Sequence, residues 1–130
     1  MKKILVFLLI SLAAKAQLSS KAEVVLVTVA PGKELHSAFG HTILWVNDPT
    51  NGIDRAYSYG TFDFNTENFY LKFLMGTLPY TISVHSMQDE FNYNAQYEMR
   101  GMIAQKLQLD SLQKNAIFLA LEKNLLPENR

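Results

Sequence analysis

The chain has 130 residues, which is enough for one hydrophobic core and too few for two domains of ordinary size. Hydrophobic residues make up 48% of it and charged residues 18%, which excludes a disordered chain. Its 12 basic and 12 acidic side chains cancel, so no basic excess favours nucleic-acid binding. The absence of cysteine excludes disulfides, thiolate zinc sites and a cysteine nucleophile within this sequence.

The N-terminus has the layout of a secretory signal peptide. Two lysines precede an apolar run over residues 4–14, and small residues then alternate up to Ala16. The run is too short to span a bilayer, which needs about 20 apolar residues. We therefore expect residues 1–16 to be cleaved and residues 17–130 to form an exported domain. That domain is slightly acidic, because the cleaved segment holds three lysines and no acid.

The first half of the exported part predicts three strands. Residues 24–30 (VVLVTVA) are a β-branched run that a Pro-Gly pair ends, which indicates a strand buried on both faces. Residues 39–47 and 55–62 predict two further strands. The loop between them contains turn-forming Asp-Pro and Asn-Gly pairs, so we expect these two strands to form a hairpin.

The middle of the chain alternates helical and strand patterns. Aromatic and leucine side chains four residues apart predict a helix over residues 66–75, with Asn65 or Thr66 as its cap. Alternating polarity predicts a strand over residues 77–85. A polar and aromatic stretch over residues 88–97 indicates a short helix.

The end of the chain predicts one more strand and the clearest helix. We interpret residues 99–107 as a strand. Asp110 followed by Gln113 is typical of a capping box, and Pro127 lies at the expected distance beyond the helix end. The expected apolar face of this helix consists of Leu112, Ala116, Ile117, Ala120 and Leu121. The order of elements predicts an α+β fold with a mostly antiparallel sheet and three helices.

Three histidines are the candidate catalytic groups, because an imidazole titrates near neutral pH. His41 directly follows Gly40 at the mouth of a strand, and we interpret it as a general base. His36 lies in a loop and His85 ends a strand, and both are interpreted as surface or structural residues. The histidine spacing matches no helical metal motif and no glycine-rich phosphate loop is present, so we expect no metal and no cofactor.

The predicted hairpin brings two further side chains near this base. If the strands pair so that His41 faces Thr61, then Tyr59 and Asp63 lie diagonally across from it on the same face. Either can orient the imidazole, as the third member of a catalytic triad does. Asp63 fits equally well as the cap of the following helix. A slip of one residue in register would destroy this arrangement.

The nucleophile is not evident from the residues. Ser37 and Ser58 are candidates, but neither lies in a G-x-S-x-G turn. Ser37 lies four residues before His41 and stays open as a candidate.

These motifs resemble the N-terminal periplasmic domain of the Lnb family of lipoprotein N-acyltransferases. The resemblance runs from about residue 24 to the end, and it is most specific where Phe39-Gly40-His41-Thr42 is followed by residues 59–64 (YGTFDF). The other matching segments are Pro31-Gly32-Lys33-Glu34-Leu35, Asp54, Asn68-Phe69, Lys72-Phe73, Gly76-x-Leu78-x-Tyr80, Arg100, Gln105-Lys106-Leu107 and Leu125-x-Pro127-Glu128-Asn129-Arg130.

The Lnb family is similar to permuted papain-like enzymes of the NlpC type, in which the catalytic His starts a strand and precedes the Cys. The resemblance therefore implies that His41 is the base, with Tyr59 and Asp63 as motif residues. It implies acyl transfer through a Cys thioester, from a phospholipid to the α-amine at the N-terminus of a lipoprotein. The implied location is the periplasm, beside a membrane surface to which hydrophobic helices of the full-length family form attach.

In the family, the Cys follows a stretch like residues 125–130. The resemblance thus implies that residues 17–130 are a partial domain, incomplete at the C-terminus, and that this form is catalytically inactive. Three other functions stay open: a papain-like amide or ester hydrolase, a non-catalytic envelope binding domain, and a zinc enzyme that uses the histidines.

Overall fold

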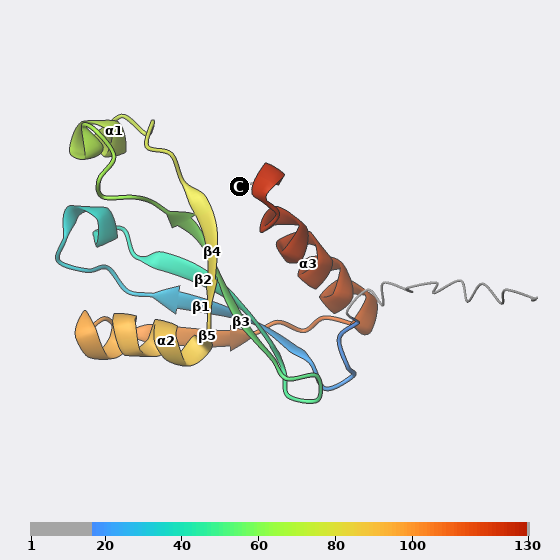
Figure 1. Cartoon of the computed structure of the whole chain (residues 1–130). Coiled ribbons are helices and arrows are strands. Elements are labelled where there is room, and N and C mark those ends of the chain that lie inside the picture. Colours follow the sequence, from blue (N-terminus) through green and yellow to red (C-terminus); the bar gives the residue numbers. More distant parts are fainter. Residues whose placement is uncertain (1–16, 130) are drawn as a thin grey trace, which may run out of the picture.

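The computed structural model describes residues 17–129, and over that range the chain folds into one sheet with helices on both faces (Figure 1). The expected signal peptide lies outside the described residues, as does Arg130. The strands are β1 (Glu23–Val29), β2 (His41–Asp48), β3 (Ile53–Thr61), β4 (Thr81–His85) and β5 (Met102–Lys106). The helices are α1 (Phe69–Leu74), α2 (Met87–Phe91) and α3 (Ser111–Asn124), with the 3₁₀ turns η1 (Leu35–Ser37) and η3 (Pro127–Asn129) and the π-helix η2 (Asn92–Tyr97).

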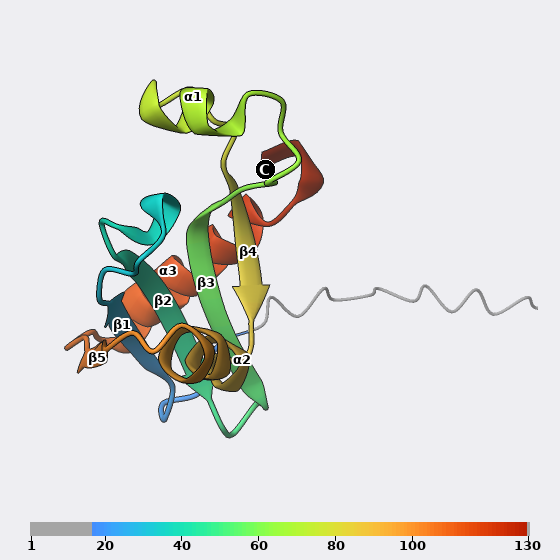
Figure 2. The same ribbon diagram turned by 90° about the vertical axis from the view of Figure 1, so that its left-hand side faces the viewer.

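Within the described residues, the five strands follow the order β4-β3-β2-β1-β5, and every neighbouring pair is antiparallel. Helices α2 and α3 cover opposite faces, and α1 lies beyond one end of the strands (Figure 2). The predicted α+β fold, with an antiparallel sheet and three helices, is confirmed.

Strand β1 is buried along one face, but on the other face only Val24 is buried, and the prediction of burial on both faces holds in part. Val24 packs in the cluster beneath α3, whereas Val25, Val27 and Val29 pack in the cluster beneath α2. Alternate side chains of a strand point to opposite faces, so this one strand contributes to both cores. The sheet is therefore the shared middle layer of the fold.

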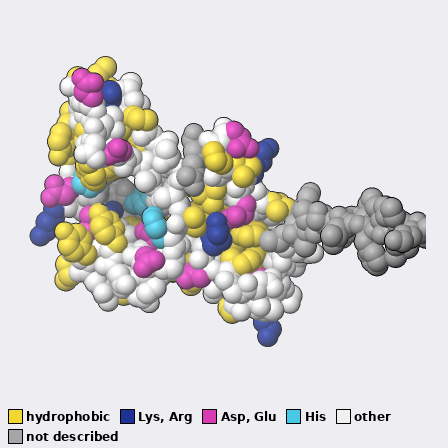
Figure 3. Space-filling model, in the orientation of Figure 1, with side chains coloured by type: hydrophobic (Ala, Val, Ile, Leu, Met, Phe, Trp, Pro, Cys, Tyr) yellow, Lys and Arg dark blue, Asp and Glu magenta, His cyan; other side chains and the backbone are white. Residues whose placement is uncertain are grey.

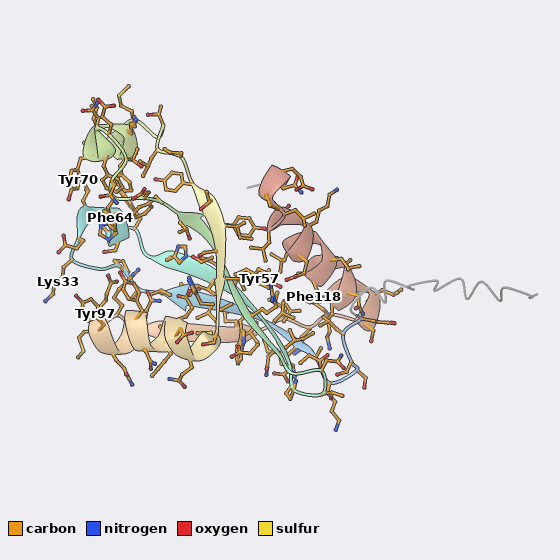
Figure 4. All side chains as sticks on the ribbon, viewed as in Figure 1. Lys33, Tyr57, Phe64, Tyr70, Tyr97 and Phe118 are labelled. Carbon is orange, nitrogen blue, oxygen red and sulfur yellow. The ribbon has the colours of Figure 1, made fainter. Side chains whose placement is uncertain are left out.

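The core beneath α3 forms around two aromatic side chains. Tyr57 of β3 and Phe118 of α3 are both buried, and they lie between the sheet and the helix (Figure 4). The Tyr57 hydroxyl donates to the carboxylate of Glu122 and accepts from Nε of Arg55 at 3.1 Å. Burial, together with the Glu122 carboxylate, raises the pKa of Tyr57 well above its ordinary value. The hydroxyl therefore stays protonated and keeps donating to Glu122.

Helix α3 is rotated relative to the predicted apolar face. Its capping box between Asp110 and Gln113 is confirmed. Leu112 is 83% exposed, so its assignment to the core was wrong. Leu121 of the predicted face is buried and Ile117 packs against the core, whereas Ala116 and Ala120 are exposed. Phe118, which the prediction left out, is buried beside Leu121, because its large aromatic ring buries more apolar area than an alanine does.

Helix α1 is shorter than the predicted helix over residues 66–75. It starts after Asn68, which has a φ of +56° and makes no side-chain cap. Oδ1 of Asp63 accepts from the backbone N–H of Asn65 at 2.8 Å, which forms a turn before the helix. The expected cap at Asn65 or Thr66, and the alternative cap at Asp63, were wrong because this turn takes their place.

The hairpin of β2 and β3 forms as predicted, but its register differs by one residue. Asp48 pairs with Ile53, and Ile43 pairs with Ser58. The loop therefore has four residues, with Gly52 at a φ of +64°, rather than the five that the expected register requires. Because a shift of one residue exchanges the two faces of a strand, Ser58 takes the face that was expected for Tyr59.

Asp48 joins this hairpin to the start of the described chain. Its fully buried carboxylate accepts from the backbone N–H of Ser19 at 2.7 Å, from Oγ of Ser19 at 2.6 Å and from Nδ2 of Asn51 at 2.8 Å. Burial alone would raise the pKa of Asp48. The hydrogen bonds from Ser19 and Asn51 outweigh that effect and hold the pKa below its ordinary value of 3.8.

We expect Asp48→Asn to lower the free energy of unfolding by about 1–3 kcal/mol, because the new amide NH2 faces donors and cannot accept from them. The lowered pKa makes the Asp48 contribution fully present above 3.8, and the contribution is lost as the pH falls through the folded-state value. Urea unfolding should therefore show a difference in the free energy of unfolding between the wild type and Asp48→Asn at neutral pH. That difference should become smaller as the pH falls below 3.8. The exposed Asp63→Asn, whose Oδ1 can still accept, is the control and should change stability by less than about 0.5 kcal/mol. An equal effect of both substitutions would contradict this role of Asp48.

Candidate functional site

A cleft of about 810 Å³ opens on the α2 side of the sheet, at the end where β2 begins. Histidine side chains lie in this hollow, with hydrophobic side chains on either side of it (Figure 3). Its polar lining includes His41, Ser58, Ser83, His85, Glu90, Asn94 and Arg100. Its apolar lining includes Phe39, Phe62, Phe64, Phe73, Leu74, Tyr80 and Tyr93.

His41 is fixed at the start of β2 by a close approach between chain segments. Gly40 has a φ of +76°, and a Cβ added there would lie 2.7 Å from the carbonyl oxygen of Val29. Only glycine fits this position without a shift of the backbone. His41 itself pairs with Val29 across the β1–β2 ladder. The imidazole is therefore attached to rigid backbone, as the sequence predicts for a strand-end base.

The partner of His41 is Ser58. Nε2 of His41 lies 2.5 Å from Oγ of Ser58, which belongs to the neighbouring strand β3. This contact follows from the observed register, which places Ser58 diagonally across from His41 on the same face. Within residues 17–129, no hydrogen bond reaches the other ring nitrogen, Nδ1. The hydroxyl thus orients the ring and leaves Nδ1 without a hydrogen bond among the described residues.

The two other predicted site residues lie elsewhere. The Tyr59 hydroxyl accepts from Nδ2 of Asn124 at 2.7 Å on the α3 side, although Tyr59 also contributes to the cleft wall. Asp63 bonds Asn65 in the turn before α1. Neither hydrogen-bonds His41, so the register prediction that joined them to it was wrong. From its sequence context, Ser58 was a candidate nucleophile and not a partner of His41. The hairpin pattern predicts the contact of Ser58 with His41 if the register of the two strands is shifted by one residue.

A polar network crosses the cleft floor from β4 to β5. Nδ1 of His85 lies 3.0 Å from Oε1 of Glu90, and Nδ2 of Asn94 donates to Oε2 of Glu90 at 3.0 Å. Nη1 of Arg100 then donates to Oδ1 of Asn94 at 3.2 Å and to Oε2 of Glu98 at 2.9 Å. His85, interpreted as a surface or structural residue, is half-exposed but joins this network.

The π-helix η2 is the element that makes this network possible. The predicted helix over residues 88–97 is observed as α2 followed directly by the wider turn of η2. Asn94 lies in that wide turn, is buried, and contacts both Glu90 and Arg100. Such turns are rare and occur often at functional sites. The sequence pattern predicts a helix here but does not distinguish its π form.

Electrostatics favour the neutral form of His41. Burial lowers the pKa of His41 from its ordinary value of 6.5, and the guanidinium of Arg100 lowers it further. The carboxylate of Glu90 acts in the opposite direction and only partly offsets the other two. At neutral pH the imidazole is therefore unprotonated, which is the form that accepts a proton from a nucleophile.

Two further findings concern metals and membranes. Over residues 17–129, no three His, Asp or Glu side chains gather closely enough to hold a metal ion. In the same range, each helix is too short or too polar to cross a bilayer.

We expect Glu90→Gln to lower the pKa of His41 further, because the substitution removes the negative charge that stabilises the imidazolium. NMR titration of the histidine ring signals measures this directly. Glu122→Gln, on the α3 side of the sheet, is the matched control and should leave the His41 titration unchanged. An unchanged or raised pKa in Glu90→Gln would show that Glu90 does not act on His41.

Comparison with known proteins gives one family. The family model of the Lnb N-terminal periplasmic domain matches residues 13–130. The searches of curated proteins and of solved structures give no match. The family match covers almost the whole chain, including every residue that lines the cleft.

Proposed function

The chain belongs to the family of Lnb N-terminal periplasmic domains, and from that premise we propose that its cleft supports acyl transfer with His41 as the general base. The observation that carries the proposal is the contact of 2.5 Å between Nε2 of His41 and Oγ of Ser58 in a cleft that also has an apolar, aromatic wall. An imidazole can act as the general base for a nucleophile when it is neutral, held in one orientation and has one ring nitrogen free to take the proton. The family description supports a periplasmic location.

The nucleophile of the proposed reaction is a thiol from outside these 130 residues, which contain no cysteine. His41 takes the thiol proton, and the thiolate attacks the carbonyl carbon of an acyl ester. The alcohol leaves with that proton, and a thioester remains. An amine then attacks the thioester, loses a proton and forms an amide, and the thiol is restored. Ser58 is a positioning residue in both steps, because it holds the ring of His41.

The apolar wall of the cleft suits an acyl chain. Phe62 and Phe64 contact edge to face at 5.0 Å between ring centroids, and Phe69 packs against both. We therefore propose a phospholipid as the acyl donor, the N-terminal amine of a lipoprotein as the acceptor, and a membrane surface as the place where both meet.

We assign Tyr59 and Asp63 supporting roles in this proposal. Tyr59 forms part of the cleft wall and ties it to α3 through Asn124. Asp63 stabilises the turn that leads into α1 and so helps to place the aromatic wall.

The base can be tested by supplying the thiol as a separate molecule. The purified chain is mixed with p-nitrophenyl octanoate and N-acetylcysteamine, and thiol-dependent release of p-nitrophenol is followed together with the octanoyl thioester. We expect a rate above that of the thiol alone, and a loss of roughly 10²-fold or more of the enhancement in His41→Ala. Ser58→Ala should lower the rate less, because it disorders the base without removing it. Ser111→Ala, at the start of α3, is the matched serine control.

Thermal unfolding of each variant shows whether a lost rate reflects a lost fold. Equal thiol-dependent rates in the wild type and in a folded His41→Ala would overturn the proposal.

A serine hydrolase is the second candidate, and the same contact of His41 with Ser58 favours it. In that case Ser58 is the nucleophile, and His41 removes the proton from its hydroxyl. The ester would then be hydrolysed without any thiol, and Ser58→Ala would abolish that activity. If the wild type does not hydrolyse the ester in the absence of a thiol, the serine hydrolase is excluded.

A further inference from the structure

Arg100 is a charged side chain at the cleft that has one spare donor nitrogen. The residue is only 8% exposed. Its Nε donates to the carbonyl oxygen of Ala30 at 2.7 Å, and its Nη1 donates to Asn94 and Glu98. Nη2 is buried, and within the described residues it has no hydrogen-bond partner.

The hydrogen bonds by which Arg100 links the chain segments around it come from Nε and Nη1, and none comes from Nη2. The bond to Ala30 ties the entry of β5 to the end of β1, and the bonds to Asn94 and Glu98 tie it to η2. Buried donors without an acceptor are rare in folded proteins, and a charged donor is the most costly kind to leave unpaired. The unpaired nitrogen therefore needs an explanation other than packing.

The three existing bonds also hold the guanidinium in one orientation. A planar guanidinium presents its N–H groups as a rigid fork, and a clamped fork loses little further freedom when a ligand binds. Such a fork matches the oxygens of a phosphate or a carboxylate, whereas it repels a cation.

The carboxylates near Nη2 already have donors among the described residues. Glu98 already pairs with Nη1, and Glu90 already accepts from Asn94 and contacts His85. Asp89 faces the hydroxyl of Ser86 at the start of α2. These carboxylates have donors within the protein, while Nη2 has no acceptor.

We propose that Nη2 of Arg100 binds an oxyanion, the phosphate or carboxylate group of a ligand that enters the cleft. This proposal rests on the proposed function in that it uses the same cleft, but it does not depend on the reactivity of His41. Two sources supply this chemistry: the head group of an amphiphile whose chain lies along the apolar wall, and a free phosphate ion.

Isothermal titration calorimetry of the full chain tests the subsite. The probes are dodecyl phosphate, inorganic phosphate, neutral dodecyl maltoside and dodecyltrimethylammonium. We expect dodecyl phosphate to bind about ten-fold more weakly to Arg100→Lys, which keeps the charge and loses the fork. Arg55→Lys on the opposite face is the matched control and should bind like the wild type. Dodecyl maltoside should bind equally to all three proteins.

A second measurement uses the wild type alone, so it remains informative if Arg100→Lys does not fold. The charge of Arg100 already affects the pKa of His41, so an anion bound at Nη2 lies near enough to act on it with the opposite sign. We expect saturating dodecyl phosphate to raise the pKa of His41 in an NMR titration, and dodecyl maltoside to leave it unchanged. Glu90 and Glu98 are the other charged groups at this floor, and both are present in every arm.

The outcomes separate the possibilities. A raised pKa with dodecyl phosphate but not with inorganic phosphate supports the subsite and identifies an amphiphile head group. A raised pKa with both also supports it and identifies a free oxyanion as sufficient. The subsite is overturned by an unchanged His41 titration with every anion, or by tighter binding of the cationic detergent. If the thiol assay fails but phosphate binds, the proposal of acyl transfer is contradicted and the proposal of an oxyanion subsite is supported.

Discussion

The pairing of Asp48 with Ile53 is the constraint on which the rest of the site depends. It sets the register of the two strands that contribute His41 and Ser58, and it does so through a loop of four residues closed by Gly52. The buried carboxylate of Asp48 holds the same loop from the N-terminal side. A local turn at one end of the hairpin thus determines which hydroxyl contacts the imidazole at the other end.

The two faces of the sheet have different tasks. The face beneath α3 is an apolar core with polar groups at its edge, among them the Tyr57 hydroxyl, which Glu122 and Arg55 satisfy. The face beneath α2 is apolar only in part, and toward the start of β2 it gives way to histidines, carboxylates and a guanidinium. The apolar core beneath α3 stabilises the strands, and the polar side chains of the cleft are attached to the ends of those strands.

Much of this fold follows from the sequence, because periodicity and turn residues act locally. The order of strands and helices and the Asp110 capping box were predicted and are confirmed. His41 at a strand end was predicted, and it lies in the cleft. The contact of His41 with Ser58 was not predicted, because the register of a hairpin depends on loop length and tertiary packing and not on the alternation of polarity along the strands. The network of Arg100 and Asn94 depends on a π-turn that no apolar pattern reveals.

The π-turn also has a consequence for how this segment tolerates changes in length. A π-helix holds one more residue in its turn than an α-helix does. Removing a single residue from Asn92–Tyr97 would restore the α-helical count and remove the wide turn in which Asn94 lies. Asn94 and Arg100 would then lose their alignment, although no residue at the cleft had been substituted. The length of this segment is therefore as much a part of the site as the chemical nature of its residues.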